Sequence, residues 1–481
     1  MSSLKQLKEQ FVSDLTGGSI EEIYLVTSIA LTSYLSYKLI KDNINSLPIV
    51  YDYVINVLTI LISITIYSNN PTTLHYSIFI PCFSIFLLNH YTSTTIGRAH
   101  TTNQQIELLP RKQFLTAYRS HMLIITNLAI LAVDFKIFPR RFAKVETWGT
   151  SMMDLGVGSF VFSMGLVNSR QIIKNQVKLK SYKFSLGTWI NTITQNTIKA
   201  LPILILGIIR FVSVKKLEYQ EHVTEYGIHW NFFITLGLLP ILLGILDPIL
   251  NLVPRVFVAF GLLVLNELIL QKTNVLEIIL SEDNRLTNFI TMNKEGIYSF
   301  LGYFTIFVFG QSFGSFVLTS YPTNDNLIAF NNKKVNKKSS LSSLLSVTTT
   351  KGLVLSTIFY QIVFNIVNNS SITTSISRRI ANPSYVLWVV SYNATLLLGY
   401  NLIDKLLPES RRGFTSILLE SINNNGLAIF LLSNLLTGLT NMSINTLERS
   451  NTESLFILIG YSITWCSIAY LLNRYKIYIK L

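Results

Sequence analysis

Long apolar runs separated by polar connections recur along the whole chain, and they constrain its fold more than any other feature. The runs at 23–40, 54–67, 253–270 and 455–472 are each near the roughly 20 residues that an α-helix needs to cross about 30 Å of hydrocarbon. Charged residues make up 13% of the sequence, whereas a soluble domain carries about a quarter. The pattern predicts an all-α, polytopic integral membrane protein and argues against a soluble globular enzyme.

We predict about 13 transmembrane helices in one polytopic domain that covers residues 1–481. The connections at 169–197 and 321–351 are polar and basic, and we expect solvated loops there. The predicted spans are 23–40, 50–67, 74–91, 121–135, 152–168, 198–213, 229–246, 253–271, 296–319, 352–367, 383–400, 425–440 and 453–472.

The amino-terminal segment 1–18 has its own periodicity. Apolar residues recur at spacings of three and four before two glycines, namely Leu4, Leu7, Phe11 and Leu15, then Gly17 and Gly18. This spacing predicts an interfacial amphipathic helix with a glycine stop, and a solvated leader is the alternative. Because no short apolar stretch precedes a small-residue cleavage site, we expect the first span to act as its own insertion signal.

The net charge of +14 comes from Lys and Arg that lie mainly in connections beside apolar runs. This placement is typical of topology-setting charge rather than of nucleic-acid binding. Asp14, Glu21 and Glu22 precede the first span, while Lys38 and Lys41 end it. The positive-inside rule and the odd number of spans therefore predict an amino terminus away from the cytosol and a cytosolic carboxyl terminus.

The connection after the fourth predicted span is basic on the side where Lys and Arg should be scarce. It contains Lys136, Arg140, Arg141 and Lys144, and Asp134 follows the apolar stretch directly. A carboxylate at the end of a span is costly to desolvate unless it is paired, and Lys144 could offset that cost. Such a pair can supply a general base, although a purely structural ion pair has the same sequence pattern.

The connection after the sixth span lies on the same predicted side and carries Glu218, His222, Glu225 and His229. Their spacings match no tight zinc motif, and we predict no metal site. His229 begins the seventh span beside Trp230, where anchoring at the membrane interface is the alternative to catalysis.

Other polar residues inside the spans are candidates by default, but most such groups hydrogen-bond between helices. Cys82 and Cys466 lie in apolar runs and predict neither a disulfide framework nor a metal site. The polar residues inside the predicted spans are Asp154, Asn266, Glu267, Gln311, Asn393 and Asn434.

Several stretches of the chain closely resemble one family, the inositol acyltransferases of GPI-anchor biosynthesis, called GPI-anchored wall transfer protein in fungi and PIG-W in animals. The resemblance covers essentially the whole chain, and the chain looks like a fungal member of this family. The divergent parts are 92–113, 169–197 and 321–351. The matching stretches are 133–163, 217–236, 294–303, 377–382, 420–426 and 476–481.

The resemblance implies an enzyme of the endoplasmic reticulum membrane, and the charge distribution then predicts an amino terminus in the lumen. It would move a fatty acyl group, typically palmitoyl, from acyl-CoA to the inositol 2-hydroxyl of glucosaminyl-phosphatidylinositol. Acyl-CoA is then a co-substrate, and no cofactor is expected. Besides these two substrates and the bilayer, the resemblance identifies no protein partner.

An alcohol that attacks a thioester needs a base and a group that stabilises the oxyanion. Asp134 suits the first role and Lys144 the second, and the resemblance makes them the catalytic pair, with His229 as second candidate base. The expected substrate-binding residues are Arg140, Arg141, Trp148, Glu218, His222, Trp230, Asn231, Arg378 and Arg379.

The four arginines in that set lie on one predicted side, and each could grip a phosphate or carry ordinary loop charge. The main rival class is a polytopic lipid or solute transporter, because such proteins also scatter polar groups through their spans. A non-catalytic membrane scaffold is a third possibility, and it would leave Asp134 replaceable. No inverted repeat is visible in the sequence, which favours the enzyme.

Overall fold

The computed structural model describes residues 4–43, 47–92, 107–178, 184–217, 223–281, 285–319, 347–370, 373–407 and 416–479. These residues form helices and no β-strand, and an isolated bridge pairs Gly17 with Thr150. The amino-terminal half contains α1 (Leu4–Phe11), α2 (Ile20–Thr27), α3 (Ile29–Asn43), α4 (Ile49–Tyr53), the π-helix η1 (Val54–Leu58), α5 (Thr59–Ile64), α6 (Pro71–Thr92), α7 (Gln113–Ala132), the 3₁₀ turn η2 (Arg140–Phe142), α8 (Asp154–Lys178) and α9 (Leu186–Leu217).

The remaining helices follow after residues 218–222. They are α10 (Val223–Tyr226), α11 (Phe232–Ile245), α12 (Asp247–Leu252), α13 (Arg255–Lys272), α14 (Val275–Leu280), α15 (Phe289–Met292), α16 (Lys294–Val317), α18 (Thr349–Asn369), α19 (Pro383–Leu406), α20 (Ile417–Asn424), α21 (Gly426–Ser443), η3 (Thr446–Glu448) and α22 (Asn451–Arg474).

Nine helices among the described residues are long and apolar enough to cross a membrane. Each of the predicted spans overlaps a helix or a run of consecutive helices, but the exact count of 13 is not confirmed. The helical runs Ile49–Ile64 and Phe232–Ile245 are apolar but shorter. The fold is thus that of a polytopic membrane protein, as the apolar pattern predicts.

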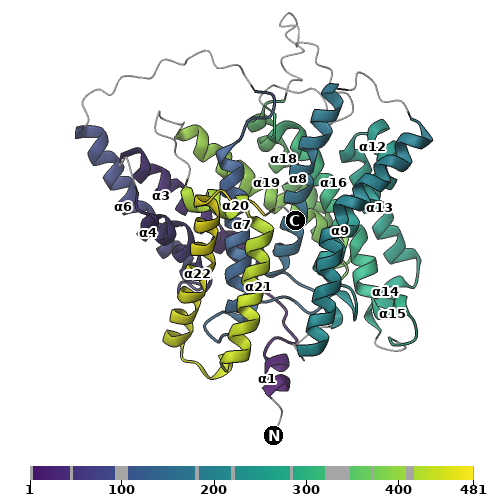
Figure 1. Cartoon of the computed structure of the whole chain (residues 1–481), viewed down its shortest axis with the longest axis horizontal. Coiled ribbons are helices and arrows are strands. Elements are labelled where there is room, and N and C mark those ends of the chain that lie inside the picture. Colours follow the sequence, from purple (N-terminus) through teal and green to yellow (C-terminus); the bar gives the residue numbers. More distant parts are fainter. Residues whose placement is uncertain are drawn as a thin grey trace, which may run out of the picture.

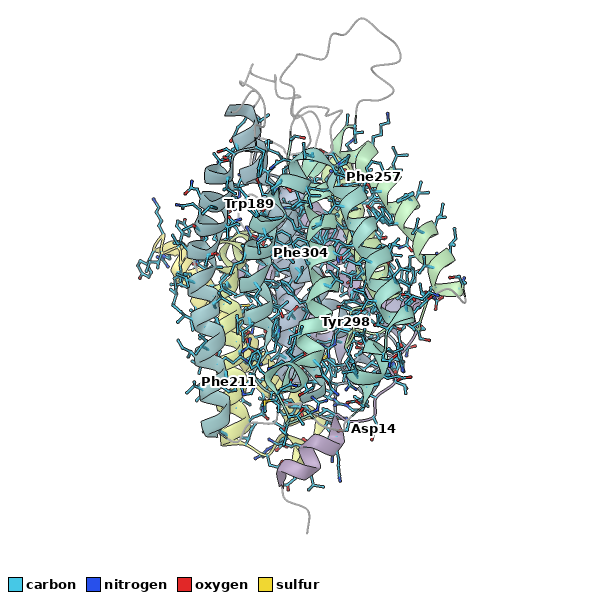
Figure 2. The ribbon with its side chains drawn as sticks, turned by 90° about the vertical axis from the view of Figure 1, so that its right-hand side faces the viewer. Asp14, Trp189, Phe211, Phe257, Tyr298 and Phe304 are labelled. Carbon is cyan, nitrogen blue, oxygen red and sulfur yellow. The ribbon has the colours of Figure 1, made fainter. Side chains whose placement is uncertain are left out.

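Large apolar side chains cover the outer helices, and Figure 2 shows Phe211 and Trp189 on α9 and Phe257 on α13 at the periphery. Phe257 is 65% exposed, although water would disfavour such a side chain on the surface. In the apolar window of α9 only 11% of the residues are buried, against 89% in that of α16. The outer surface is therefore suited to lipid, and α16 lies at the centre.

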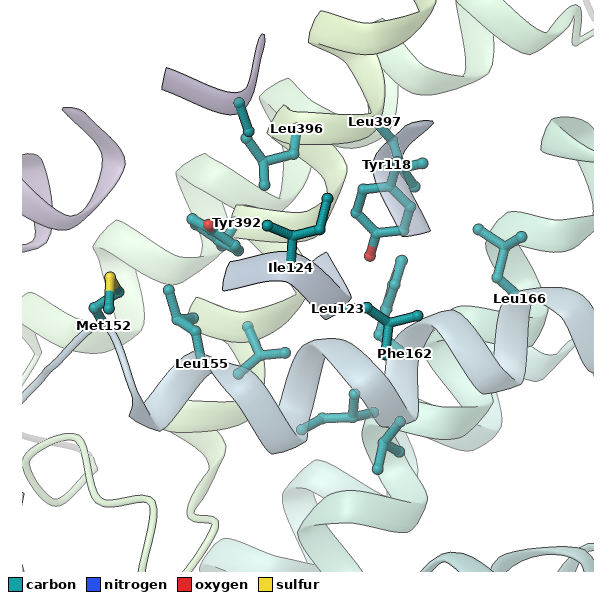
Figure 3. Close-up of a cluster of buried hydrophobic side chains, with 14 of the residues drawn as sticks. Tyr118, Leu123, Ile124, Met152, Leu155, Phe162, Leu166, Tyr392, Leu396 and Leu397 are labelled. Carbon is teal, nitrogen blue, oxygen red and sulfur yellow. The ribbon is translucent and has the colours of Figure 1, made fainter. Parts of the chain in front are cut away.

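The contact between α8 and α16 depends on glycines. A Cβ atom added to Gly165 would lie 2.1 Å from the backbone oxygen of Phe307, and one added to Gly310 would lie 2.2 Å from that of Phe162. The two helices can therefore pack backbone to backbone, as small residues allow in membranes. Figure 3 shows the apolar cluster beside this contact, with Phe162 from α8 and Tyr118 from α7.

The bundle has two ends, which we name by the short helices there. At one end, Lys8 of α1 donates to Asn441 at the end of α21, 3.2 Å away. At the other, Asn425 beside α20 bonds the backbone of Ile477 and Ile479 near the carboxyl end. The α1 end and the α20 end are thus opposite each other, as Figure 1 also shows.

Two expectations from the sequence are corrected. Residues 169–178 belong to α8 and 186–197 to α9, so most of the connection predicted as a loop is helical. The first helix ends at Phe11, and the glycine stop is wrong: Gly17, at φ +83°, lets the chain approach Thr150 instead. Most of the loop predicted at 321–351 lies outside the described residues, and 349–351 begin α18.

Candidate active site

A cavity of about 330 Å³ lies inside the bundle, bounded mainly by α7, α8, α19, α21 and the connection into α11. Its lining along α7 runs from Tyr118 to Val133, a length of roughly 22 Å at 1.5 Å per residue. Most of the lining is apolar or aromatic. The charged residues in the lining of the cavity are Asp134, Lys144, Arg210 and Glu225.

Asp134 lies two residues past the end of α7, at the α1 end of the bundle. Its Oδ2 accepts a hydrogen bond of 2.7 Å from Nδ2 of Asn441, whose Oδ1 in turn accepts from Lys8. Burial raises the pKa of the Asp134 carboxyl, while the Asn441 bond and the charges of Lys8 and Arg140 act in the opposite direction. The carboxyl therefore combines access to the cavity with a proton affinity above that of an ordinary aspartate.

Lys144 takes part in a four-residue ion network. Its Nζ donates to Oε1 and Oε2 of Glu225 at 2.7 and 2.8 Å. Arg378 binds the same carboxylate at 3.0 Å through Nη1 and Asp154 at 2.9 Å through Nε. The side chain of Lys144 is 40% exposed, whereas those of Arg378 and Asp154 are 5% and 1% exposed. The network thus extends from the cavity wall into the core.

The ion pair that we predicted between Asp134 and Lys144 is not formed, and this expectation is corrected. Both side chains line the same cavity. Among the described residues, however, the ion-pair partner of Lys144 is Glu225, supplied by α10. The two candidate groups are therefore held separately, each by its own neighbours.

Arg140 and Arg141 do not line the cavity. Arg140 donates to the backbone oxygens of Phe135 and Phe138 and stacks on Phe11, 4.0 Å from the ring centroid. Arg141 forms an ion pair of 2.8 Å with Glu22. Both side chains thus fasten the connection 133–153 to the amino-terminal segment.

Arg379 and Trp148 lie in a separate cluster beside α14. Arg379 pairs with Glu295 at 3.1 Å, and the fully buried Glu295 also pairs with Arg285 at 2.6 Å. Trp148 packs against a small apolar group of Leu270, Ile279 and Ile380. Neither predicted residue lines the cavity.

The connection into α11 divides its predicted residues between two roles. The ring of His229 packs between Phe211 and Phe289, and it does not line the cavity. Trp230 and Asn231 do line it. Asn231 caps α11 by accepting from the backbone N–H groups of residues 233 and 234.

Glu218 and His222 lie outside the described residues. Within the described part of the chain, no group of three or more His, Cys, Asp or Glu side chains could hold a metal ion.

Sequence reasoning missed three members of the site. Glu225 was considered only as a metal ligand, and Asp154 only as a packing residue, although an acid among basic connections indicates ion pairing. Asn441, which binds Asp134, carries no signal of its own because its partner lies 307 positions away in the sequence.

Comparison with known proteins gives a consistent result. The family model described as GWT1 matches residues 4–472. GPI-anchored wall transfer protein 1 of Candida albicans is 63% identical over 489 residues, covering 100% of both chains. The proteins of that name from Debaryomyces hansenii and Saccharomyces cerevisiae are 54% and 44% identical, again over 100% of both chains.

Proposed function

Since the chain belongs to the GPI-anchored wall transfer protein family, which acts in GPI-anchor biosynthesis, we propose that it is an acyl-CoA-dependent inositol O-acyltransferase. The acceptor in this proposal is the inositol 2-hydroxyl of glucosaminyl-phosphatidylinositol. The acyl group, palmitoyl in the simplest case, comes from acyl-CoA.

The observation that carries the proposal is that Asp134 and Lys144 both line one largely apolar cavity. A carboxylate and an ammonium beside an apolar space fit a reaction between a polar hydroxyl and a long-chain thioester. An aromatic part of the wall, formed by Phe160, Phe232 and Phe430, suits an acyl chain. Phe430 belongs to α21, in whose apolar window only 22% of the residues are buried.

The proposed step balances without a cofactor. The inositol hydroxyl oxygen attacks the thioester carbonyl carbon as Asp134 takes the hydroxyl proton, and a C–O bond forms. The tetrahedral intermediate collapses, and its C–S bond breaks. The CoA thiolate leaves and takes up the proton from Asp134, which gives free CoA and an inositol ester.

Lys144 has the electrostatic part in this proposal. An ammonium group directed at the carbonyl oxygen stabilises the negative charge that develops there. Glu225 and Arg378 act as positioning residues, because Glu225 binds Lys144 directly and Arg378 holds Glu225 in place. A preorganised cation needs little reorganisation during the reaction.

We further propose that the protein resides in the endoplasmic reticulum membrane with the α1 end in the lumen. The distribution of Lys and Arg supports this orientation. A glycosylation acceptor inserted near residue 336 should stay unmodified in microsomes, and modification of that acceptor would reverse the orientation.

The test of the function uses purified full-length protein in detergent, with no second compartment. Palmitoyl-CoA and glucosaminyl-phosphatidylinositol should give stoichiometric free thiol and a lipid whose mass has increased by one palmitoyl group. A transporter has no net reaction under these conditions. Absence of both products with well-folded protein would contradict the enzyme proposal.

A further inference from the structure

Arg210 of α9 lines the cavity, and its charge is not matched there. Lys144 and Glu225, which also line the cavity, belong to a network of two cations and two acids. Among the described residues, no ion pair and no hydrogen bond of a side chain includes Arg210. A cation of this kind beside an apolar space indicates a ligand of opposite charge.

Contacts with the segment 223–233 fix the position of Arg210. One turn earlier on α9, the backbone oxygen of Gly207 accepts a hydrogen bond of 2.9 Å from Nδ2 of Asn231, which lines the same cavity. The guanidinium carbon of Arg210 lies 5.9 Å from the ring centroid of Phe233 in the first turn of α11. Arg210 is therefore held beside the segment that supplies Glu225, the partner of Lys144.

The helix that carries Arg210 also faces the bilayer. Arg210 is exposed, and its neighbours Ile208 and Ile209 are 59% and 54% exposed without lining the cavity. Figure 2 shows Phe211, the next residue, at the periphery and toward the end of the bundle where Asp14 lies. Arg210 thus belongs both to the cavity wall and to a surface suited to lipid, from which a lipid substrate would come.

The arginines that the sequence suggested for a phosphate are engaged elsewhere. Each binds an acid or backbone oxygens of the protein, and none lines the cavity. They are Arg140, Arg141, Arg378 and Arg379. The structure therefore leaves Arg210 as the stronger candidate for this role.

We propose that Arg210 binds the phosphodiester of the acceptor, glucosaminyl-phosphatidylinositol, which enters the cavity from the bilayer beside α9. This inference rests on the proposed function and assigns one of its substrates a binding residue. The planar guanidinium fork of arginine binds two phosphate oxygens at once. The bond would also fix the inositol ring, and with it the reacting hydroxyl.

The chemistry of the two substrates favours the acceptor over the donor. In the acceptor, the phosphodiester is attached to the same inositol ring that carries the reacting hydroxyl, so a cation on the wall of the reaction cavity can reach it. In acyl-CoA, the pantetheine arm separates the phosphates from the thioester. Exposed isoleucines beside Arg210 suit the diacylglycerol of a lipid rather than a nucleotide.

The test compares two acceptors in the detergent assay: glucosaminyl-phosphatidylinositol and an analogue in which an uncharged ether linkage replaces the phosphodiester. Wild-type protein should show a KM about tenfold higher for the ether analogue. Arg210→Gln should raise the KM for the natural acceptor by about tenfold. The variant should leave the KM for the ether analogue and that for palmitoyl-CoA unchanged.

Arg210→Gln should fold, because it removes no hydrogen bond or ion pair formed by a side chain of the described residues. Arg210→Lys, which keeps the charge but not the fork, should lie between the wild type and Arg210→Gln. It carries the same comparison if Arg210→Gln cannot be purified. Lys199→Gln is the matched control, because Lys199 is an exposed cation of α9 that does not line the cavity. It should keep both acceptor KM values.

A binding measurement separates this inference from the proposed function. The Kd of radiolabelled glucosaminyl-phosphatidylinositol is measured without any acyl donor, and Arg210→Gln should raise it by about tenfold. If the wild-type protein forms no ester, the proposed function fails. The Kd values then decide the role of Arg210 by themselves, and equal values for the wild type and Arg210→Gln would overturn it.

Three kinetic results would also overturn the inference. Equal changes in KM for both acceptors would make the role of Arg210 structural. A raised KM for palmitoyl-CoA, with an unchanged KM for the acceptor, would assign Arg210 to the phosphates of the donor. Loss of a dependence on added anionic phospholipid, with discrimination between the two acceptors intact, would assign it to a headgroup of the surrounding bilayer.

Discussion

The Nζ of Lys144 lies within 2.8 Å of both carboxylate oxygens of Glu225, and Arg378 shares one of these oxygens. Burial alone would raise the pKa of Glu225, but the charges of Lys144 and Arg378 outweigh it and lower that pKa to about 2. Glu225 therefore stays ionised throughout the pH range of an enzyme assay. In the proposed mechanism the acid limb of the pH–rate profile is therefore assigned to Asp134 rather than to Glu225.

The Lys144–Glu225 pair should behave as one unit in mutagenesis. We expect Glu225→Gln to lower kcat by about tenfold, because it frees the ammonium from its fixed position. Lys144→Ala should be more severe, and the double variant should be no worse than Lys144→Ala alone. If the fold-losses in kcat of the two single variants multiply in the double variant, the two residues act independently. Glu453→Gln, an exposed acid at the start of α22, is the control.

The hydrogen bond from Asn441 should set the acid limb of the pH–rate profile. Because this bond lowers the pKa of Asp134, Asn441→Ala should raise that pKa and move the acid limb of kcat/KM to higher pH. Ser443→Ala, two residues further along the chain, should not move the limb. If the acid limb of kcat/KM for Asn441→Ala stays at the wild-type pH, Asp134 is not the group that titrates in that limb.

Asp134→Asn should cost activity without costing stability. The pKa of Asp134 is raised in the folded protein, so its contribution to stability is fully present below the unfolded pKa and is lost as pH rises through the folded pKa. At pH 7 the buried charge is thus a net cost, which the amide removes. Thermal unfolding of the purified variant should occur at or above the wild-type temperature, and a marked decrease would contradict this account.

Cys82→Ala and Cys466→Ala should keep most of the wild-type turnover. Both thiols are free and buried, and neither lines the cavity. The proposed transfer is direct and forms no acyl-thioester on the protein. Loss of acyl transfer in either variant, with an unchanged elution profile on size exclusion, would favour a covalent intermediate.

The helical architecture could be predicted from the sequence because the bilayer requires long apolar segments. The helix boundaries could not. The polar residues of 169–178 and 186–197 belong to α8 and α9. A membrane helix can continue past its apolar residues into polar ones, and hydropathy does not show where such an extension ends. Close packing also leaves little trace in hydropathy: a Cβ added to Gly158 of α8 would lie 2.7 Å from the side chain of Val389.

The sequence brought Asp134 and Lys144 forward as candidates, but it did not predict their partners. Asp134 and Lys144 were identified from a misplaced cluster of charge, and both line the cavity. Their actual partners, Asn441 and Glu225, come from segments far along the chain. Without an alignment no sequence pattern links such positions, so the partners required the structure.

The most direct test of the account is a single-turnover experiment on wild-type and Asp134→Asn protein, purified in detergent and saturated with both substrates. The account predicts that the variant binds palmitoyl-CoA with the wild-type Kd. It should form the inositol ester more slowly by about 10²–10⁴-fold, the contribution of a general base. A single-turnover rate constant for Asp134→Asn within a factor of about two of wild type would contradict the assignment of Asp134 as the base.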